Sequence, residues 1–229
     1  LNNIVLTIQN YMSNYVLIIA LLGAGLWFSF RLGFIQVRGF GEGMRRTFGG
    51  LFSKKGEAGA DGMSSFQALA TAIAAQVGTG NIAGAATALA IGGPGAIFWM
   101  WIAAFLGMAT IYAEAIMAQK YKTVGADGQV TGGPVYYIRA AFKGTFGKVL
   151  AGIFAILITL ALGFMGNAVQ SNSIAASFHT AFGIPQWIMG VVVAVIALFV
   201  FAGGIERIAK VTETIVPLMA ALYIVGALI

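Results

Sequence analysis

The sequence predicts an all-α, polytopic membrane protein, and three observations support this fold class. Of the 229 residues, 59% are hydrophobic and 9% are charged, whereas a soluble domain carries about 25% charged residues. Several apolar runs reach the roughly 20 residues that a membrane-spanning helix needs. All 13 lysine and arginine residues fall in three segments between such runs. The composition excludes a soluble core, and these loops account for the net charge of +6 without a nucleic-acid partner.

Six membrane spans are expected along the chain. The first, residues 15–30, lies too far inside the sequence for a signal peptide and lacks the charged lead and cleavage site of one. The second is the long apolar stretch Met63–Gly93. The last begins near Val211 and contains Pro217, which would kink the helix or remove one of its hydrogen bonds. The other three are residues 95–119, 148–178 and 186–203.

The connections between these spans differ in character. Residues 31–57 hold six of the 13 basic residues among apolar ones, which indicates an amphipathic segment at the membrane interface. Residues 120–147 are polar and glycine-rich, and GGPVYYIRAAF within them predicts a short surface helix. The remaining connections are expected to be a tight turn at Gly92–Gly95, a short loop at His179–Pro185 and a short basic loop at Gly203–Lys210.

The basic residues indicate how the spans are oriented. Because successive loops alternate sides, segments 31–57, 120–148 and 206–210 lie on one side, and the opposite loops carry no lysine or arginine. The positive-inside rule makes that side cytoplasmic and the N-terminus external, in the inner (cytoplasmic) membrane of the cell. Two separate spans within 63–93 would place 31–57 and 120–148 on opposite sides, which the charge distribution disfavours.

The centre of Met63–Gly93 is unusual for a membrane helix. It reads Gln76-Val77-Gly78-Thr79-Gly80-Asn81, so two glycines and three polar side chains lie at one depth. Glycine weakens a helix, and polar groups at mid-membrane are costly and commonly functional. We therefore expect a broken helix with arms at about 64–77 and 82–91. Such a joint presents carbonyls to a cation and amides to an anion.

Close helix packing is the alternative explanation of the same stretch. Small residues spaced along a membrane helix let a neighbouring helix approach. The residues that would serve this role are Ala68, Ala72, Ala75, Gly80 and Gly84. The three polar residues beside the glycines favour the broken helix.

Other polar residues within the spans are candidates for function. Glu114 is either a gate carboxylate or a charge that reaches the interface near a helix end. Asn167, Gln170 and Ser171 share a helical face and form either a substrate cavity or hydrogen bonds between helices. Glu213 is expected at a helix start, where a carboxylate is favourable, and His179 is assigned no role. Paired carboxylates and Ser/His/Asp sets are absent from the sequence, as is cysteine, so an enzyme has little support.

The stretch QVGTGNIAGAATALAIGGPGAIFWMWIAAFLGMATIYAEA closely resembles the signature of the alanine or glycine:cation symporters, the sodium:alanine symporter family. RLGFIQVR, TGGPVYYI, NAVQSNSIA and GGIERIAKVTE extend the resemblance from about residue 30 to 215. It implies a leucine-transporter-type fold of two inverted five-helix repeats, the first helix of each broken. On that basis 1–62 holds an extra leading helix and a basic segment, 63–229 is the first repeat, and the second repeat is absent. The non-methionine start at Leu1 and the apolar end agree with a fragment at both ends.

The resemblance also implies roles for residues at the joint. Gly78-Thr79-Gly80-Asn81 matches an unwound G-x-G-N motif. The amides of Thr79 and Gly80 would bind a substrate carboxylate, and the Asn81 side chain would approach a sodium ion. The carbonyls of Ala74 and Val77 would help to form a second sodium site. Two departures from well-studied relatives, a glutamine before the glycines and a missing tyrosine in the long span, leave four further substrate-cavity candidates: Gln76, Phe164, Asn167 and Gln170.

The expected function is sodium-driven import of a small neutral amino acid, alanine or glycine, by alternating access. Na⁺ is the coupling ion, and the expected partners are the substrate and membrane lipid. The alternative is a non-transporting helical subunit or scaffold, in which the glycines serve packing. Stereochemistry, ion stoichiometry, coupling to protons in place of sodium, and oligomeric state stay open at this point.

Overall fold

The computed structural model describes residues 2–52, 65–125 and 130–228. Within these ranges the chain is nearly all helical, and it divides into two compact units. The first unit comprises Leu1–Met44 and Thr87–Ala151, and the second comprises Arg45–Ala86 and Gly152–Ile229. The end of the predicted interfacial segment, residues 53–57, lies outside the described residues.

The first unit opens with one long helix. It consists of α1 (Asn2–Tyr11), a π-helical segment η1 (Met12–Leu17) and α2 (Ile18–Arg31). The predicted span 15–30 is therefore too short, since the helix includes nearly all of the preceding residues. The reason is that residues 2–14 contain no glycine or proline and carry enough apolar side chains to continue the helix.

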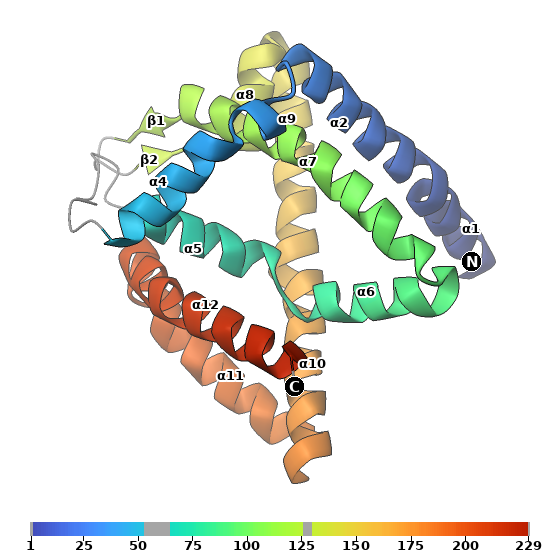
Figure 1. Ribbon diagram of the computed structural model, residues 1–229, viewed down its shortest axis with the longest axis vertical. Coiled ribbons are helices and arrows are strands. Elements are labelled where there is room, and N and C mark those ends of the chain that lie inside the picture. The colour runs from blue at the N-terminus through green and yellow to red at the C-terminus, as the bar shows by residue number, and fades with distance from the viewer. Residues whose placement is uncertain (1, 53–64, 126–129, 229) are drawn as a thin grey trace. The chain divides into compact units, whose positions relative to one another are not determined.

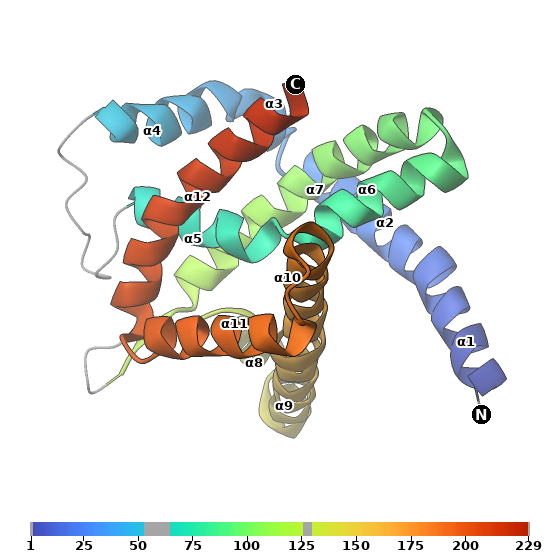
Figure 2. The same ribbon diagram turned by 90° about the horizontal axis from the view of Figure 1, so that it is seen from below.

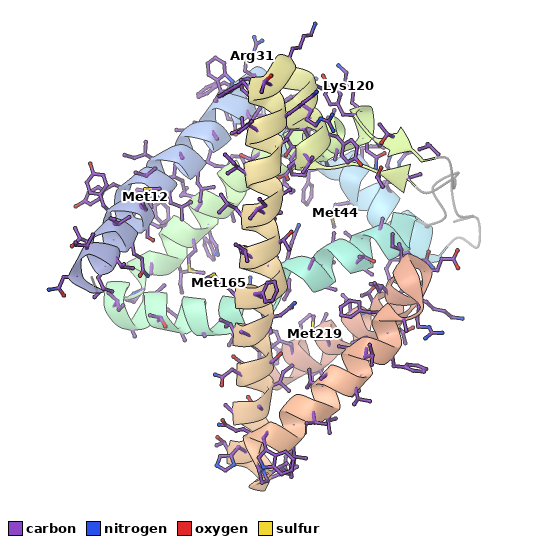
Figure 3. The ribbon with its side chains drawn as sticks, turned by 180° about the vertical axis from the view of Figure 1, so that it is seen from behind. Met12, Arg31, Met44, Lys120, Met165 and Met219 are labelled. Atoms are coloured by element: carbon purple, nitrogen blue, oxygen red, sulfur yellow. The ribbon has the colours of Figure 1, made fainter. Side chains whose placement is uncertain are left out.

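Helix α2 packs against α7 (Gly95–Lys120) at a point of close approach (Figure 1). A Cβ on Gly25 would lie 2.8 Å from the Leu106 Cβ and 3.0 Å from its carbonyl oxygen, so only glycine fits there. Ser29 is fully buried and donates its hydroxyl to the Gly25 carbonyl at 2.7 Å. Figure 3 places Arg31 and Lys120, at the basic ends of these two helices, at the same end of the pair.

Short elements complete the first unit. The predicted interfacial segment forms α3 (Ile35–Arg38) and α4 (Phe40–Phe52), although α4 belongs to the second unit from Arg45 onward, and the predicted short helix is confirmed as α8 (Pro134–Ala141). A hairpin was not expected: β1 (Thr123–Val124) pairs antiparallel with β2 (Val130–Thr131). Its four residues are β-branched, which favours strands even in a short polar connection.

The second unit is built from helices that pack in a chain. Helix α5 (Ser65–Gln76) lies against α12 (Gly204–Leu228), α12 against α11 (Gln186–Phe201), and α11 against α10 (Asn167–Phe182) (Figure 2). The residues buried in this unit are small: Ala70, Ala175, Ala209 and Val216. Small side chains let the helix backbones approach closely, as is typical of membrane helices.

The long span is one helix of 39 residues, Gly144–Phe182. It runs from α9 (Gly144–Ile158) through a π-helical segment η2 (Thr159–Gly166), where Figure 3 labels Met165, into α10. The predicted span 148–178 is too short, and the loop predicted at 179–185 is wrong up to residue 182. The helix ends where Gly183, at φ 69°, donates its N–H to the His179 carbonyl at 2.9 Å.

The loop predicted at Gly203–Lys210 is also wrong, because α12 already begins at Gly204. The Arg207 guanidinium donates to the Phe199 carbonyl at 2.8 Å and lies over its ring, which ties the start of α12 to the end of α11. Pro217 lies inside α12, which nevertheless continues to Leu228. Proline removes the backbone bond to the Glu213 carbonyl there. Between α6 (Thr79–Gly92) and α7 the predicted turn is confirmed at Gly93 and Pro94.

Four helices in the described ranges are long and apolar enough to cross a membrane: Asn3–Arg31, Gly95–Lys120, Gly144–Phe182 and Gly204–Leu228. Helix α11, predicted as 186–203, is apolar but shorter; its 16 residues rise about 24 Å at 1.5 Å per residue. Large apolar side chains are widely exposed, such as Ile19 at 70% and Leu198 at 71%. A surface of this kind requires lipid, so the chain is a multi-pass membrane protein.

Candidate functional site

The predicted broken helix is confirmed, and the break lies at Val77 and Gly78. Helix α5 ends at Gln76, and α6 begins at Thr79 rather than at the predicted residue 82. The α5 end points its carbonyls, and the α6 start its amides, toward the joint, which places partial negative and positive charge there.

Close packing within the described structure does not explain Gly80 and Gly84. A Cβ at Gly80 or Gly84 would meet no atom within 4 Å. The predicted packing alanines 68, 72 and 75 are exposed, whereas Ala70 is buried. Packing of α5 therefore uses a different face from the one that the alternative explanation named.

Backbone bonds at the joint are diverted from their helical partners. In a continuous helix, the N–H groups of residues 78, 79 and 81 would bond to the carbonyls of residues 74, 75 and 77. Instead, Gly78 N–H donates to the Asn81 side chain at 2.9 Å, and Thr79 N–H donates to the Gln170 side chain at 3.2 Å. Asn81 N–H donates to the Gly78 carbonyl at 3.1 Å. The carbonyls at 74, 75 and 77 thereby lose the donors of a continuous helix.

Gln170 of α10 lies across the joint. Its Oε1 accepts two hydrogen bonds from one residue, Thr79: the N–H at 3.2 Å and the hydroxyl at 2.7 Å. A Cβ on Gly78 would lie 3.0 Å from the Gln170 Cδ and would collide with its Nε2, so the amide fits because residue 78 has no side chain. Thr79 therefore supplies two donors to one acceptor oxygen, and Gly78 leaves the space that the acceptor group occupies.

Asn81 explains why α6 begins early. It lies three residues after Gly78, and its Oδ1 accepts the Gly78 N–H at 2.9 Å. This is the return bond of a capping box, made from the third helical position. An arm that began at the predicted residue 82 would have Asn81 as its N-cap, but α6 begins three residues earlier and Gly78 takes the N-cap position.

The other predicted site residues do not all meet at the joint. Ala74, Gln76 and Gly80 are exposed on the two arms, and Val77 is 47% exposed. Phe164, in η2, is 67% exposed. Asn167 donates its amide to the Gly163 carbonyl of its own helix at 3.0 Å. Of the polar face on the long span, Gln170 is the member for which the described structure gives a hydrogen bond to the joint.

A second polar contact, which the sequence analysis missed, joins α5 to α12. Gln67 donates its amide to the Glu213 carboxylate at 2.9 Å, and the Thr71 and Thr212 hydroxyls are 3.0 Å apart. Glu213 lies in the third turn of α12, so its predicted place at a helix start is wrong. The spacing of Gln67 and Thr71 on one helical face was the available signal, but their partners lie more than 140 residues away.

Glu114 lies near the end of α7, beside α8, in the first unit. Burial, and then the negative charge of Glu114, raise the pKa of the Tyr137 hydroxyl on α8 above its ordinary value. Glu114 is half-buried. The Glu114 carboxylate of α7 therefore lies close to helix α8.

Chemically, the joint is built for recognition. Its donors are backbone amides and the Thr79 hydroxyl, and its acceptors are backbone carbonyls at the end of α5. Donors at a helix N-terminus favour an anionic group, and carbonyl oxygens favour a hard cation. The same few residues can therefore receive a molecule with a negative group together with a small cation.

Comparison with known proteins gives a consistent set of matches. The sequence profile described as "Sodium:alanine symporter family" matches residues 1–229. The chain is 43% identical over 229 residues, 99% of its length, to the "Sodium/alanine symporter AgcS" of Methanococcus maripaludis. Over 209 residues, 91% of its length, it is 45% identical to the "Amino-acid carrier protein AlsT" and 43% identical to the "Probable sodium/glutamine symporter GlnT", both of Bacillus subtilis.

These matches cover 50%, 43% and 42% of the three relatives, so the chain spans about half the length of the curated relatives that it matches. The match nevertheless extends over the whole of this chain, through both compact units and the broken helix. The chain belongs to the sodium:alanine symporter family.

Proposed function

We propose that the protein containing this chain imports a small neutral amino acid, alanine or glycine, together with sodium. The observation that carries this proposal is that the N–H and the hydroxyl of Thr79 both donate to one oxygen. Beside them lie carbonyls at the end of α5 that lack the N–H donors of a continuous helix. Membership of the sodium:alanine symporter family supports it. Nothing specific favours the alternative of a non-transporting scaffold.

The substrate carboxylate binds at the start of α6 in this proposal. Its oxygen takes the position that the Gln170 Oε1 holds in the structure, and it accepts bonds from Thr79 and from the Gly80 amide. The partial positive charge at the N-terminus of a 14-residue helix adds to these bonds. Gln170 then turns its amide toward the substrate, and Gln76, Phe164 and Asn167 line the rest of the cavity.

Sodium binds at the end of α5. The carbonyls of Ala74 and Val77 are the proposed ligands of one ion, and their diverted hydrogen bonds support this assignment. The Asn81 Oδ1 approaches an ion near the substrate; it already accepts the Gly78 N–H and has a second lone pair. The potential across the membrane supplies about 2.3 kcal/mol per charge per 100 mV for uptake.

Small residues at the joint set the proposed substrate size. Ala75, Gly78 and Gly80 leave room for side chains of about one carbon, which suits alanine and glycine. Relatives of equal identity carry names for alanine and for glutamine, so the substrate is proposed from the joint itself.

The proposed architecture is the leucine-transporter type, working by alternating access. Residues 1–62 form a leading helix with its basic segment, and 63–229 form the first inverted repeat with its broken first helix. The N-terminus is external and the basic loops are cytoplasmic in the inner membrane. The shared end of Arg31 and Lys120 on α2 and α7 supports this orientation.

The proposal is tested by uptake of labelled alanine into proteoliposomes containing the full-length protein, with and without an inward sodium gradient. The parent should accumulate alanine only with sodium, and glycine but not leucine should compete. Thr79→Val removes the hydroxyl donor at nearly constant volume. It should raise the half-saturating alanine concentration about tenfold, the equivalent of about 1.4 kcal/mol for a bond to a charged group.

Thr180→Val is the matched control, because the exposed Thr180 hydroxyl donates only to its own helix, at the Ala176 carbonyl. Its alanine titration should equal that of the parent. Uptake that is indifferent to sodium, or a Thr79→Val titration equal to the control, would contradict the proposal.

A further inference from the structure

We propose that Glu213 is a positioning residue for sodium coupling: through Gln67 it holds α5 against α12 and so fixes the carbonyls that bind the ion. This inference rests on the proposed sodium site at the end of α5. It adds to that site a residue that does not contact sodium or substrate.

The contact between the two helices is a pair of side-chain bonds in register. Gln67 Nε2 donates to Glu213 Oε2 at 2.9 Å, and the Thr71 and Thr212 hydroxyls are 3.0 Å apart. Gln67 and Thr71 are one helical turn apart, and Thr212 and Glu213 are consecutive. The bond to a carboxylate is of the stronger, charge-assisted kind.

Close packing around these bonds keeps the two helices at hydrogen-bonding distance. Ala70 and Ala209 are each 2% exposed, and Val216 is 6% exposed. The Thr212 hydroxyl also lies 2.9 Å from the Ala209 carbonyl and 3.0 Å from that of Ile208, so its orientation is set by its own helix. Glu213 itself is half-buried. A carboxylate within a membrane helix is costly to keep and commonly has a function.

The same face of α5 continues to the proposed ion site. Gln67, Ala70, Thr71 and Ala74 follow the i, i+3, i+4, i+7 spacing of one helical face. Ala74 lies about 10 Å beyond Gln67 along the helix at 1.5 Å per residue. Its carbonyl is one of those whose helical donor is diverted at the joint.

Helix α5 depends on α12 for its place. It has 12 residues, fewer than the roughly 20 that a helix needs to span a membrane by itself. Within the second unit, its main packing partner is α12. A small tilt of α5 would move the Ala74 and Val77 carbonyls, and misplacement of a binding group by about 1 Å can cost about 100-fold. Loss of the Glu213 bond should therefore weaken sodium binding more than alanine binding.

The test is a sodium titration of alanine uptake by the full-length protein in proteoliposomes. Glu213→Ala and Gln67→Ala should each raise the half-saturating sodium concentration about tenfold, and the double variant should add little to either. The half-saturating alanine concentration at saturating sodium should change less than twofold. Glu206→Ala, an exposed carboxylate on the first turn of the same helix, is the control and should leave both titrations unchanged.

Exchange of the two side chains separates positioning from general destabilisation. Gln67→Glu alone places two carboxylates face to face and should shift the sodium titration further than Gln67→Ala. Gln67→Glu combined with Glu213→Gln restores a donor and a carboxylate in reversed order, and should return the titration to within about threefold of the parent. Glu213→Gln alone keeps an acceptor oxygen for the Gln67 amide and should shift the sodium titration less than Glu213→Ala does. Gln67→Ala keeps the test informative if Glu213→Ala does not fold.

Three results are decisive. Rescue by the exchanged pair, with alanine affinity spared throughout, supports the positioning role. A folded Glu213→Ala or Gln67→Ala protein with the parent's sodium titration, or an exchanged pair no better than Gln67→Glu, overturns this inference and leaves the proposed function standing. A parent without sodium-dependent uptake removes the proposed function and this inference with it.

Discussion

The two compact units hold their polar groups in different ways. In the first unit, Ser29 bonds to the Gly25 carbonyl four residues away, and Gln36 donates to Ser29 at 2.8 Å from seven residues away. In the second unit, Thr79 bonds to Gln170 and Gln67 to Glu213, across 91 and 146 residues. In the first unit these hydrogen bonds stay within one segment, whereas in the second they join separate helices.

This difference indicates which helix contacts a ligand can change. The α2–α7 contact is maintained by shape, because Gly25 admits the Leu106 backbone and Ser29 bonds within its own helix. The Thr79–Gln170 contact is maintained by donors that a carboxylate can also engage. Substitutions should therefore damage stability in the first unit and ligand binding in the second.

The largest effect is expected from Gly78→Ala. The added Cβ would collide with the Gln170 amide, and it lies on backbone that must keep its turn for Thr79 to face Gln170. Alanine uptake by the full-length protein should fall about 100-fold, as for a binding group displaced by about 1 Å. The melting temperature of the purified protein should change little, because the joint is largely exposed.

Gly84→Ala is the control for that substitution. It lies on α6, and its added Cβ would meet no atom within 4 Å. It should keep the parent's uptake. If the Gly78→Ala protein took up alanine as well as the Gly84→Ala protein, the joint would tolerate an added side chain as well as the middle of α6 does, and this prediction would be wrong.

Gly25→Val should reverse this pattern. Its Cβ would lie 2.8 Å from the Leu106 Cβ and 3.0 Å from a backbone oxygen, which cannot move without shifting α7. Overpacking of this kind costs about 1–3 kcal/mol, so the melting temperature should fall by several degrees. Half-saturating sodium and alanine concentrations of the remaining folded protein should equal those of the parent.

Gly23→Val, on the same helix with no atom within 4 Å of its Cβ, controls for the effect of valine on helix propensity. A smaller loss of stability is expected there. If Gly25→Val shifted the sodium titration instead of the melting temperature, the proposed division between a unit held by shape and a unit open to ligands would be wrong.

Sequence reasoning located the helices better than their ends. Apolar content and the glycine pair at Gly78 and Gly80 were sufficient to locate four long apolar helices of the described ranges and the break, whereas the six expected spans include α11 and the two arms of the broken helix, which are shorter. Helix ends depended on contacts that no local pattern contains, such as Arg207 with the Phe199 carbonyl at the start of α12. The β-branched hairpin residues were visible in the sequence, but they were outweighed by the polar glycine-rich context.

Prediction of the candidate site was limited by long-range pairing. Thr79 and Asn81 could be singled out because their own neighbours are glycines. Gln170 was one of three polar residues on a face, and its selection over Asn167 required the position of α10 beside the joint. No sequence pattern pairs Gln67 with Glu213, because a hydrogen bond between residues 146 positions apart follows only from the packing of α5 on α12.

The smallest expected effect concerns Asn81, whose two possible roles the structure now separates. As the third residue after Gly78, it returns its Oδ1 to the Gly78 N–H. Serine at this position is too short to make that bond, so a serine variant would alter the turn and the proposed ion ligand together. Aspartate keeps the length and the acceptor oxygen, and a carboxylate in the first turn of a helix is favourable. Asn81→Asp should therefore fold as the parent does.

If Asn81 only caps α6, Asn81→Asp should leave both the sodium and the alanine titrations unchanged. If its oxygen approaches sodium beside the substrate, the added negative charge attracts the cation and repels the carboxylate at Thr79. Two unit charges about 4 Å apart interact by about 1 kcal/mol even in water, which corresponds to about a fivefold change. We expect half-saturating sodium to fall by about that factor and half-saturating alanine to rise by it. Asn172→Asp, at an exposed position on α10, should shift neither the sodium nor the alanine titration. If the titrations of Asn81→Asp and Asn172→Asp were the same, Asn81 would act only as a cap.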